Sequence, residues 1–414
     1  MRRHVALFVL LGCAYPAFAR AQDAAPQMPD MPGMNHSASA MSSAPGWHWM
    51  EDANVFFGFN DQERRFRDFS AWESQNWFMV DGLNRLKGGT FRVFDMTSLE
   101  PFTMHKIGSP QVFQTGETFH LAPLIDYQHP HDLFMGLGTD YTHSSGRVSY
   151  VIGADVVGSP TLGPVAFMHR PSAYGNPQAP LSHHYLDSTH ITPGVVRGTI
   201  AVDGFGVGAS WFRGEEPDEN RKDIDLGALN SYALQLSWTR GPWSAQASGA
   251  RLHDPEIITP ADADRYTASV AYTRGPAGAA PHGEGSAPHL AALFFAFGQN
   301  REIHGNFDAY LFEGTLTAGA RGLIYTRAES VDKDILDAGF HPRGVFHRHR
   351  HSRVGALTVG YLWDFLRTRA GTFGVGADVT VYSVPLNLRD AYGAPSSYHV
   401  FVHYSLHGAG GMIH

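Results

Sequence analysis

Cysteine is almost absent from this chain. Its 414 residues include one cysteine, Cys13, which falls inside the segment that we expect to be cleaved from the N-terminus. The mature chain would then have neither disulfides nor thiolate ligands. Any metal ion that it binds must therefore be held by histidine, methionine, aspartate or glutamate.

Charged residues and long hydrophobic runs are also scarce. Charged residues make up 17% of the chain and hydrophobic residues 43%, whereas a soluble domain usually carries about 25% charged residues. The formal net charge of -8, with few basic clusters, argues against a nucleic-acid partner. No stretch after the N-terminal segment approaches about eighteen uninterrupted apolar residues, which excludes a transmembrane helix.

The N-terminus divides into two segments that precede the main domain. Residues 1–21 combine a basic start at Arg2 and Arg3, a short apolar run and an A-x-A site ending at Ala21, which predicts a secretory signal peptide. A lipoprotein box around Cys13 is the alternative. Residues 22–46 are rich in Met, Pro, Ser and Ala, and we expect them to be disordered because they carry little apolar surface. Residues 47–414 form the main domain.

Apolar and polar residues alternate with a period of two throughout this domain, and turn residues separate the runs. In Ser231–Thr239, for example, the residues on one face are Tyr232, Leu234, Leu236 and Trp238. Apolar rows with aromatic ends opposite small polar rows are typical of a transmembrane β-barrel. We therefore expect an all-β fold, a single antiparallel barrel of about 16 strands (range about 12 to 16) in the outer membrane.

Short and long connections alternate between the predicted strands. Tight turns are expected at residues 144–146, 203–204, 241–242, 318–321 and 368–371, and long polar connections at residues 100–132, 158–190, 214–230 and 331–352. Bacterial barrels have short periplasmic turns and long external loops, so this order places both termini in the periplasm.

Histidines gather in two of the long connections. His129 precedes Pro130 and should be extended, so His129 and His131 project to the same side. In the second connection Pro180 predicts a short helix on which His183, Asp187 and His190 share a face. The candidate metal ligands are His129, His131, Asp132, His183, His184, Asp187 and His190, with Asp126 as an alternative carboxylate.

Neutral imidazoles with a carboxylate suit zinc, copper(II), nickel or cobalt. The expected cofactor is accordingly a transition-metal ion, copper or zinc. The alternative is that these side chains hydrogen-bond one another and fold the long connections into the barrel mouth.

Two other histidine-containing stretches have different chemistry. Met28, Met31, Met34 and His36 form M-x-x-M-x-x-M-x-H in the tail, and soft thioethers select Cu(I). Biased composition of a disordered segment is the alternative. The basic run F-H-R-H-R-H at residues 346–351 is expected to be a solvated loop face, since protonated histidines among arginines repel cations.

Several of these stretches resemble a known family. The stretches Q-T-G-E-T (114–118), P-L-I-D-Y-Q-H-P-H-D-L-F-M (123–135), F-M-H-R (167–170) and S-H-H-Y-L-D-S-T-H-I-T (182–192) are similar to an uncharacterised group of Gram-negative secreted proteins. That group is predicted to form outer-membrane barrels and is associated with heavy-metal resistance. The Met/His tail separately resembles the N-terminal region of the copper-resistance outer-membrane protein B family. The resemblance implies a location and a metal context.

The leading hypothesis is an outer-membrane barrel that binds or passes transition-metal ions, with copper as the first candidate, in metal tolerance. Its partners would be outer-membrane lipid, metal ions and periplasmic metal-resistance proteins. One alternative is a passive porin-like or structural barrel without a specific ligand. Another is a metal-dependent membrane hydrolase, in which a bound ion activates water, although the chain has no G-x-S-x-G and no H-E-x-x-H.

Overall fold

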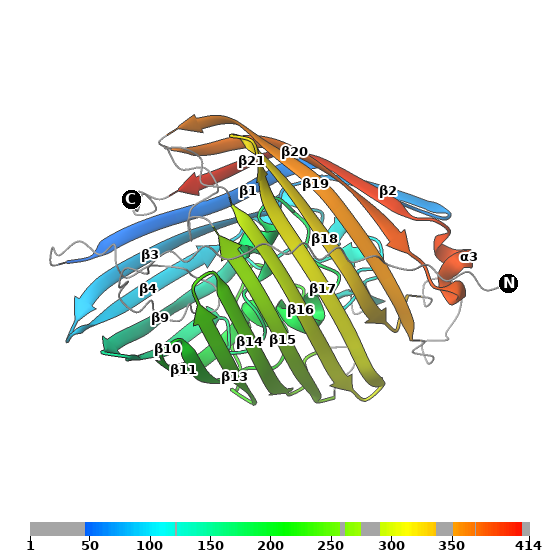
Figure 1. Cartoon of the computed structure of the whole chain (residues 1–414). Coiled ribbons are helices and arrows are strands. Elements are labelled where there is room, and N and C mark those ends of the chain that lie inside the picture. The colour runs from blue at the N-terminus through cyan, green and yellow to red at the C-terminus, as the bar shows by residue number, and fades with distance from the viewer. Residues whose placement is uncertain are drawn as a thin grey trace, which may run out of the picture.

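The computed structural model describes residues 46–120, 122–256, 261–274, 290–336, 351–368 and 370–407. One antiparallel sheet closes on itself into a barrel (Figure 1). The first and last strands make the closure, pairing from Asp52 with His407 to Glu63 with Ser396. The wall has sixteen strand positions, because β2 and β3 lie one after the other along β1. The predicted all-β barrel is confirmed.

The wall strands are, in chain order, β1 (His48–Arg64), β2 (Arg67–Glu73), β3 (Asn76–Leu86), β4 (Gly89–Thr97), β9 (Phe134–Ser145), β10 (Val148–Gly158), β11 (Thr192–Val202), β12 (Phe205–Phe212), β13 (Ser231–Arg240), β14 (Trp243–Leu252), β15 (Ala263–Arg274), β16 (Ala291–Glu302), β17 (Gly305–Ala318), β18 (Gly322–Lys333), β19 (Ser352–Thr368), β20 (Gly371–Ser383) and β21 (Ser396–His407). The connections contain α1 (Glu100–Thr103), β5 (Ser109–Pro110), β6 (Thr118–Phe119), β7 (Ala122–Pro123), β8 (Tyr127–Gln128), η2 (Phe167–His169), η3 (Pro171–Ala173), α2 (His183–Leu186), η4 (Ser188–His190), η6 (Leu386–Leu388) and α3 (Arg389–Tyr392).

Short turns join the strands at one end of the barrel, which we call the short-turn end. The five tight turns predicted from the sequence all lie there, within a residue or two of their predicted positions. The β15–β16 connection at the same end lies outside the described residues. The opposite, long-loop end carries the connections at residues 98–133, 159–191, 213–230 and 334–351. In bacterial outer-membrane barrels the short-turn end faces the periplasm.

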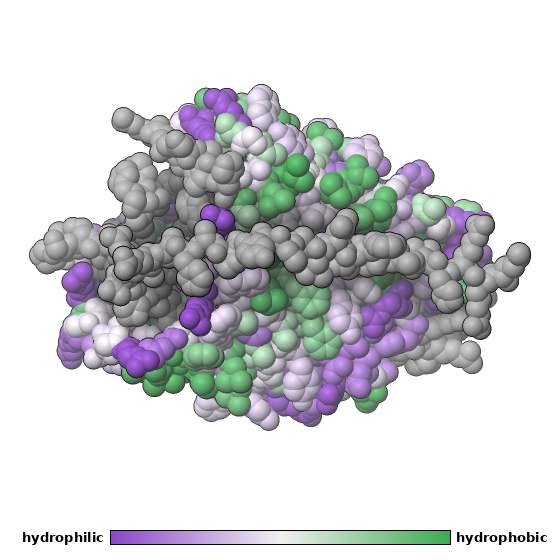
Figure 2. Space-filling view, in the orientation of Figure 1, coloured by the Kyte–Doolittle hydropathy of each residue, from purple (hydrophilic) through white to green (hydrophobic). Residues whose placement is uncertain are grey.

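The outside of the wall is apolar and its lumen side is polar. In β20, Val379 and Val381 are exposed on the outside, whereas Asp378 and Thr380 are buried in the lumen. Aromatic residues lie near the strand ends, as where the rings of Trp243 and Tyr272 pack 4.9 Å apart at the short-turn end. Figure 2 shows hydrophobic residues over the strands of one face and hydrophilic residues mainly toward the ends.

This is the surface of a barrel that faces lipid with its apolar side chains and the membrane interfaces with its aromatic ones. The chain is therefore an outer-membrane β-barrel. Among the described residues no helix is long and apolar enough to cross a membrane, a finding that has no bearing on crossing by strands.

Two of the long connections fold into the lumen. We call them the β4–β9 loop (residues 98–133) and the β10–β11 loop (residues 159–191). The β10–β11 loop contacts Ser210 on β12, Glu313 on β17 and Ser405 on β21 through hydrogen bonds of 3.0, 2.8 and 3.0 Å. Because these strands stand around the wall, the loop crosses the barrel. Figure 1 shows its green turns, with cyan segments of the β4–β9 loop, inside the strands.

Apolar side chains of both loops form a core with lumen-facing residues of the wall. Phe113, Leu181 and Leu186 pack in one buried cluster with Leu311 and Val354 of the wall. Burying a side chain of this size stabilises a fold by about 1.5–3 kcal/mol. This core holds the histidine-bearing segments inside the barrel.

Candidate functional site

The two histidine stretches meet inside the barrel. The ring centroids of His131 and His190 lie 5.4 Å apart, and those of His129 and His184 lie 6.3 Å apart. Within the β10–β11 loop, the His183 ring lies 5.2 Å from that of His190 and 5.4 Å from that of His184. We call these five residues the histidine cluster.

Glu100, at the start of α1, positions His131. Its Oε2 accepts hydrogen bonds from the backbone N–H of His131 at 2.8 Å and from the ring Nδ1 at 2.9 Å. A carboxylate can only accept here, so the ring hydrogen is on Nδ1. Nε2 of His131 is buried and has no hydrogen-bond partner.

Asp187 positions the histidines of the β10–β11 loop. Its Oδ1 accepts from His183 Nδ1 at 2.8 Å, and its backbone oxygen accepts from His190 Nδ1 at 2.8 Å. Nε2 of His190 is also buried without a hydrogen-bond partner. Asp187 is itself fixed by Arg170, whose Nη1 lies 2.6 Å from Oδ2.

The helix expected from Pro180 is shorter than predicted. α2 is a single turn that begins at His183, three residues after Pro180, and the Pro180 carbonyl accepts the His183 N–H at 3.0 Å. The 3-10 turn η4 follows and carries His190. His183 and Asp187 nevertheless keep the predicted i, i+4 contact.

Glu117 lies beside two members of the histidine cluster, His129 and His184, and we call these three residues the Glu117 group. Their candidate ligand atoms lie within 4.8 Å of one another. His129 Nε2 is 2.6 Å from Glu117 Oε1, and its Nδ1 is 2.8 Å from the Pro130 carbonyl oxygen. Both ring nitrogens thus face acceptors, although a neutral imidazole has one hydrogen to donate. A second ring proton, which makes the imidazolium, or a cation bound at Nε2 would satisfy the second contact.

Arg221 lies beside the Glu117 group, and its positive charge offsets the negative charges of nearby carboxylates. Its guanidinium lies 3.3 Å from Glu117 and 3.4 Å from Asp132. Burial raises the pKa of Glu117, but His129 and Arg221 outweigh it and hold that pKa well below its ordinary value. Glu216 lies 3.8 Å from His184 Nδ1, and burial, with the charge of Glu117, raises its pKa well above the ordinary value.

Most of the clustered imidazoles are neutral near pH 7. Burial lowers the pKa of His183 to about 4 and of His184 to about 4. Burial and two neighbouring imidazoles lower the pKa of His190 well below its ordinary value. At His131 burial lowers the pKa, but the Glu100 carboxylate outweighs it and the pKa is raised. Neutral imidazole is the form that ligates a metal ion.

The cluster fits a transition-metal ion. Metal-ligating histidines usually donate their other ring N–H to a carboxylate or a backbone carbonyl, which fixes the ring orientation. His131, His183 and His190 make that contact through Nδ1. Three buried Nε2 atoms in the cluster, those of His131, His184 and His190, lack a hydrogen-bond partner. Such atoms are rare in folded proteins and point to an ion or water that completes the site.

Two of the carboxylates predicted as metal ligands contact other residues. Asp132 contacts Arg221. Asp126 lies 2.8 Å from Arg64 and accepts from the Phe113 N–H and the Tyr392 hydroxyl, so it is not part of the histidine cluster. The tail candidates Met28, Met31, Met34 and His36 lie outside the described residues, as does the basic run except for its last histidine.

Five charged residues of the site were not predicted from the sequence: Glu100, Glu117, Glu216, Arg170 and Arg221. Glu117 and Arg170 did stand inside the Q-T-G-E-T and F-M-H-R stretches that resemble the known family. The other three are single charged residues in loops, without a local pattern that marks them.

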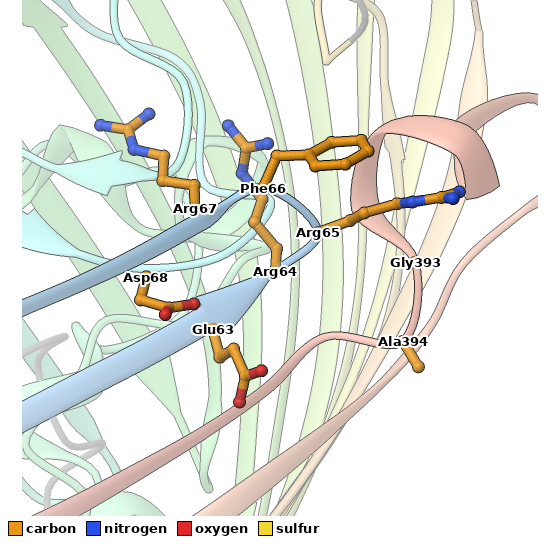
Figure 3. Close-up of a pocket in the computed structure, with 8 residues that line it drawn as sticks. All are labelled: Glu63, Arg64, Arg65, Phe66, Arg67, Asp68, Gly393 and Ala394. Atoms are coloured by element: carbon orange, nitrogen blue, oxygen red, sulfur yellow. The ribbon is translucent and has the colours of Figure 1, made fainter.

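A separate hollow lies at the long-loop end, between the β1–β2 turn and residues 393–394 (Figure 3). Its charged lining consists of Glu63, Asp68 and three arginines, Arg64, Arg65 and Arg67. The hollow shares no residue with the histidine cluster, and its arginines disfavour a metal cation.

No protein-family model and no curated protein matches this chain. Solved structures of outer-membrane porins do. OprB of Pseudomonas putida, at high pH, is 9% identical with a TM-score of 0.50, and the match covers 87% of this chain and 94% of OprB. An anion-selective porin from Comamonas acidovorans is 10% identical with a TM-score of 0.49, covering 87% and 99% of the two chains. OccK2 (OpdF) of Pseudomonas aeruginosa is 9% identical with a TM-score of 0.42, covering 86% and 97%. At these identities the likeness to OprB shows the fold alone, a porin-like barrel.

Proposed function

We propose that this outer-membrane barrel binds a transition-metal ion in the histidine cluster, with copper as the first candidate, and serves in metal tolerance. The observation that carries the proposal is the set of buried Nε2 atoms of His131, His184 and His190 without hydrogen-bond partners. Leaving a buried polar atom unsatisfied costs about 1–3 kcal/mol. A bound ion would remove that cost at each nitrogen that it contacts.

The Glu117 group offers the first set of ligands. The ligand atoms of Glu117, His129 and His184 are within 4.8 Å of one another, slightly more than twice a metal–nitrogen bond of about 2.0–2.1 Å. The set combines neutral imidazole with a carboxylate, which suits copper(II) and zinc.

The second set consists of His131, His183 and His190, and it adjoins the first through the neighbouring residues His183 and His184. All three of its Nδ1 atoms are held, so Nε2 is the nitrogen that each ring offers. Three imidazoles are a common protein ligand set for zinc. The ring nitrogens of these three residues do not all lie within 4.8 Å of one another, as the ligand atoms of the Glu117 group do, so the rings would have to move to share one ion.

The filling of the barrel supports a binding role over a passive pore. The β10–β11 loop crosses the lumen and is tied to the wall by Arg170, which contacts Glu313 on β17. A cavity beside it, lined by Gln178, Arg327 and His399 among others, has a volume of about 10 Å³, the size of one water molecule. A metal ion moving through this barrel would meet the histidine cluster.

Metal analysis of the purified full-length protein tests the proposal. Protein folded in detergent is loaded with Cu(II) or Zn(II), desalted and analysed for bound metal. The variants His129→Ala/His184→Ala and His131→Ala/His190→Ala should each lose bound metal. The matched control is His105→Ala/His304→Ala, two exposed loop histidines, and it should retain the wild-type content.

Heat-dependent gel mobility shows that each variant still forms the barrel. Wild-type metal content in both cluster variants would contradict the proposal. Metal uptake by strains carrying the same variants then tests the link to tolerance.

A further inference from the structure

Methionines gather at one place in the lumen. The described residues contain six methionines. Met79, Met96 and Met135 belong to a single buried cluster, and the partly buried Met168 packs against it. We call these four residues the methionine cluster. Trp77 and Ile191 pack in the same cluster.

Three wall strands and one loop supply the four side chains. Met79 on β3 and Met96 on β4 are directly paired across the strands, and both are buried on the lumen side. Met135 lies on β9 beside the register shift that follows Met96. Met168 lies on η2 in the β10–β11 loop. Residues far apart in sequence are therefore brought together by the barrel and its inserted loop.

Methionine is concentrated in this one cluster. The other three buried clusters of the described residues are built from Leu, Phe, Val, Ala, Ile and Tyr and contain no methionine. Toward the short-turn end the next lumen-facing positions are Asp81 on β3 and Phe94 on β4, and Arg92, beyond Phe94, pairs with Asp81 at 2.6 Å. Among the buried clusters of the described residues, methionine is therefore concentrated at one position in the lumen.

The methionine cluster adjoins the histidine cluster. Met168 follows Phe167, whose ring lies 6.1 Å from that of His131 and 5.6 Å from that of His183. Ile191, a member of the same buried cluster, follows His190. The side of the methionine cluster toward the short-turn end is bordered by Asp81 and Phe94, with Arg92 beyond them.

We propose that the methionine cluster is a binding site for a soft monovalent cation, Cu(I) or Ag(I). Thioether sulfur is a neutral, polarisable ligand that selects soft ions over Zn(II) and other harder dications. This inference rests on the proposed function, because both assign a metal cargo to the lumen. The methionine site, however, consists of different residues and takes a different class of ion.

Silver titration of the purified full-length protein in detergent tests the inference, because Ag(I) is soft and is stable in air. All variants carry Met28→Leu, Met31→Leu, Met34→Leu and Met41→Leu, so that the tail does not contribute thioethers. Replacing Met79, Met96, Met135 and Met168 with Leu conserves volume, and cores tolerate such changes. We expect this variant to bind one fewer Ag(I) per chain, while Met50→Leu/Met104→Leu, as the matched control, loses none.

If the fourfold variant does not form the barrel, Met79→Leu/Met96→Leu is tested alone, and it must also bind one fewer Ag(I) per chain. Equal Ag(I) binding in the cluster and control variants overturns the inference. Cu(II) content, measured on the same samples, reports the histidine cluster separately. Loss of Ag(I) with retained Cu(II) supports a distinct site. Unaltered Cu(II) content in the histidine variants overturns the proposed function, whatever the methionine variants do.

Discussion

Glu100 holds His131 by two contacts, since its Oε2 accepts both the backbone N–H at 2.8 Å and the ring Nδ1–H at 2.9 Å. The carboxylate thereby fixes both the place and the rotation of the imidazole. It also leaves Nε2 as the nitrogen available to a ligand. The ring contact recurs within the β10–β11 loop, where Asp187 Oδ1 accepts from His183 Nδ1 at 2.8 Å.

Glu100→Gln tests whether this contact serves metal binding. The amide keeps the shape of the side chain but removes the charge that favours the Nδ1–H tautomer, so we expect affinity for Cu(II) or Zn(II) to fall by about 10–100-fold. Competition with a chromophoric chelator measures the affinity. The exposed residue Glu51 offers a control, Glu51→Gln, with no expected effect. Equal affinities in the two variants would show that Glu100 has a structural role alone.

Arg170→Met should destabilise the β10–β11 loop. Arg170 is buried between Asp187 at 2.6 Å and Glu313 at 2.8 Å, and removing one partner of a buried ion pair typically costs about 3–5 kcal/mol. Hydrogen–deuterium exchange of residues 159–191 measures the free energy of opening. Arg147→Met, which breaks an exposed contact with Asp203, should leave exchange unchanged. Unchanged exchange of residues 159–191 in Arg170→Met would show that Arg170 does not hold the β10–β11 loop in place.

Gly298→Ala should displace α2 from the wall. A Cβ at Gly298 would lie 2.4 Å from the Tyr185 carbonyl oxygen, closer than any real contact. The displaced loop should lower metal content and raise ion conductance in planar bilayers. Gly198→Ala, whose nearest contact would be 3.8 Å, is the control. Wild-type conductance in Gly298→Ala would mean that the loop does not obstruct the lumen.

Acid should loosen the β10–β11 loop. Burial lowers the pKa of His184 to about 4 from its ordinary 6.5, so an opened loop binds more protons than the packed loop between these pH values. The free energy of opening should therefore fall as pH decreases from 6.5 toward 4. The raised pKa of His131, caused by Glu100 despite burial, opposes this trend at one residue.

Hydrogen–deuterium exchange at pH 7 and pH 5, corrected for intrinsic rates, measures the difference. His184→Gln should reduce it. An opening free energy that stays constant or rises toward pH 5 would refute the prediction.

Leu236→Arg tests the lipid-facing side of the wall. Leu236 lies on β13 with 61% of its surface exposed, and a charge on the lipid face near the bilayer centre costs about 2–4 kcal/mol. Urea unfolding in lipid vesicles measures the loss. Leu226, 64% exposed in the β12–β13 connection, gives the control Leu226→Arg with little change. Equal stabilities would place β13 away from lipid.

The sequence determined the barrel. Alternation of apolar and polar residues is a local pattern with the period of a strand, so each strand and its two faces can be read without knowing its neighbours. Turn residues mark the strand ends in the same way, which is why the tight turns and long connections were predicted correctly. The location of the histidines in long connections was equally local.

The tertiary structure decided what those connections do. That they fold inward follows from ion pairs such as Arg170 with Glu313, which are 143 residues apart, and from an apolar core shared by loop and wall. The pairing of His131 with His190, the carboxylates of Glu100 and Glu117, and the gathering of four methionines all depend on which strands close next to one another. No periodic pattern encodes such contacts, because each is made once, between segments that the closed barrel brings together.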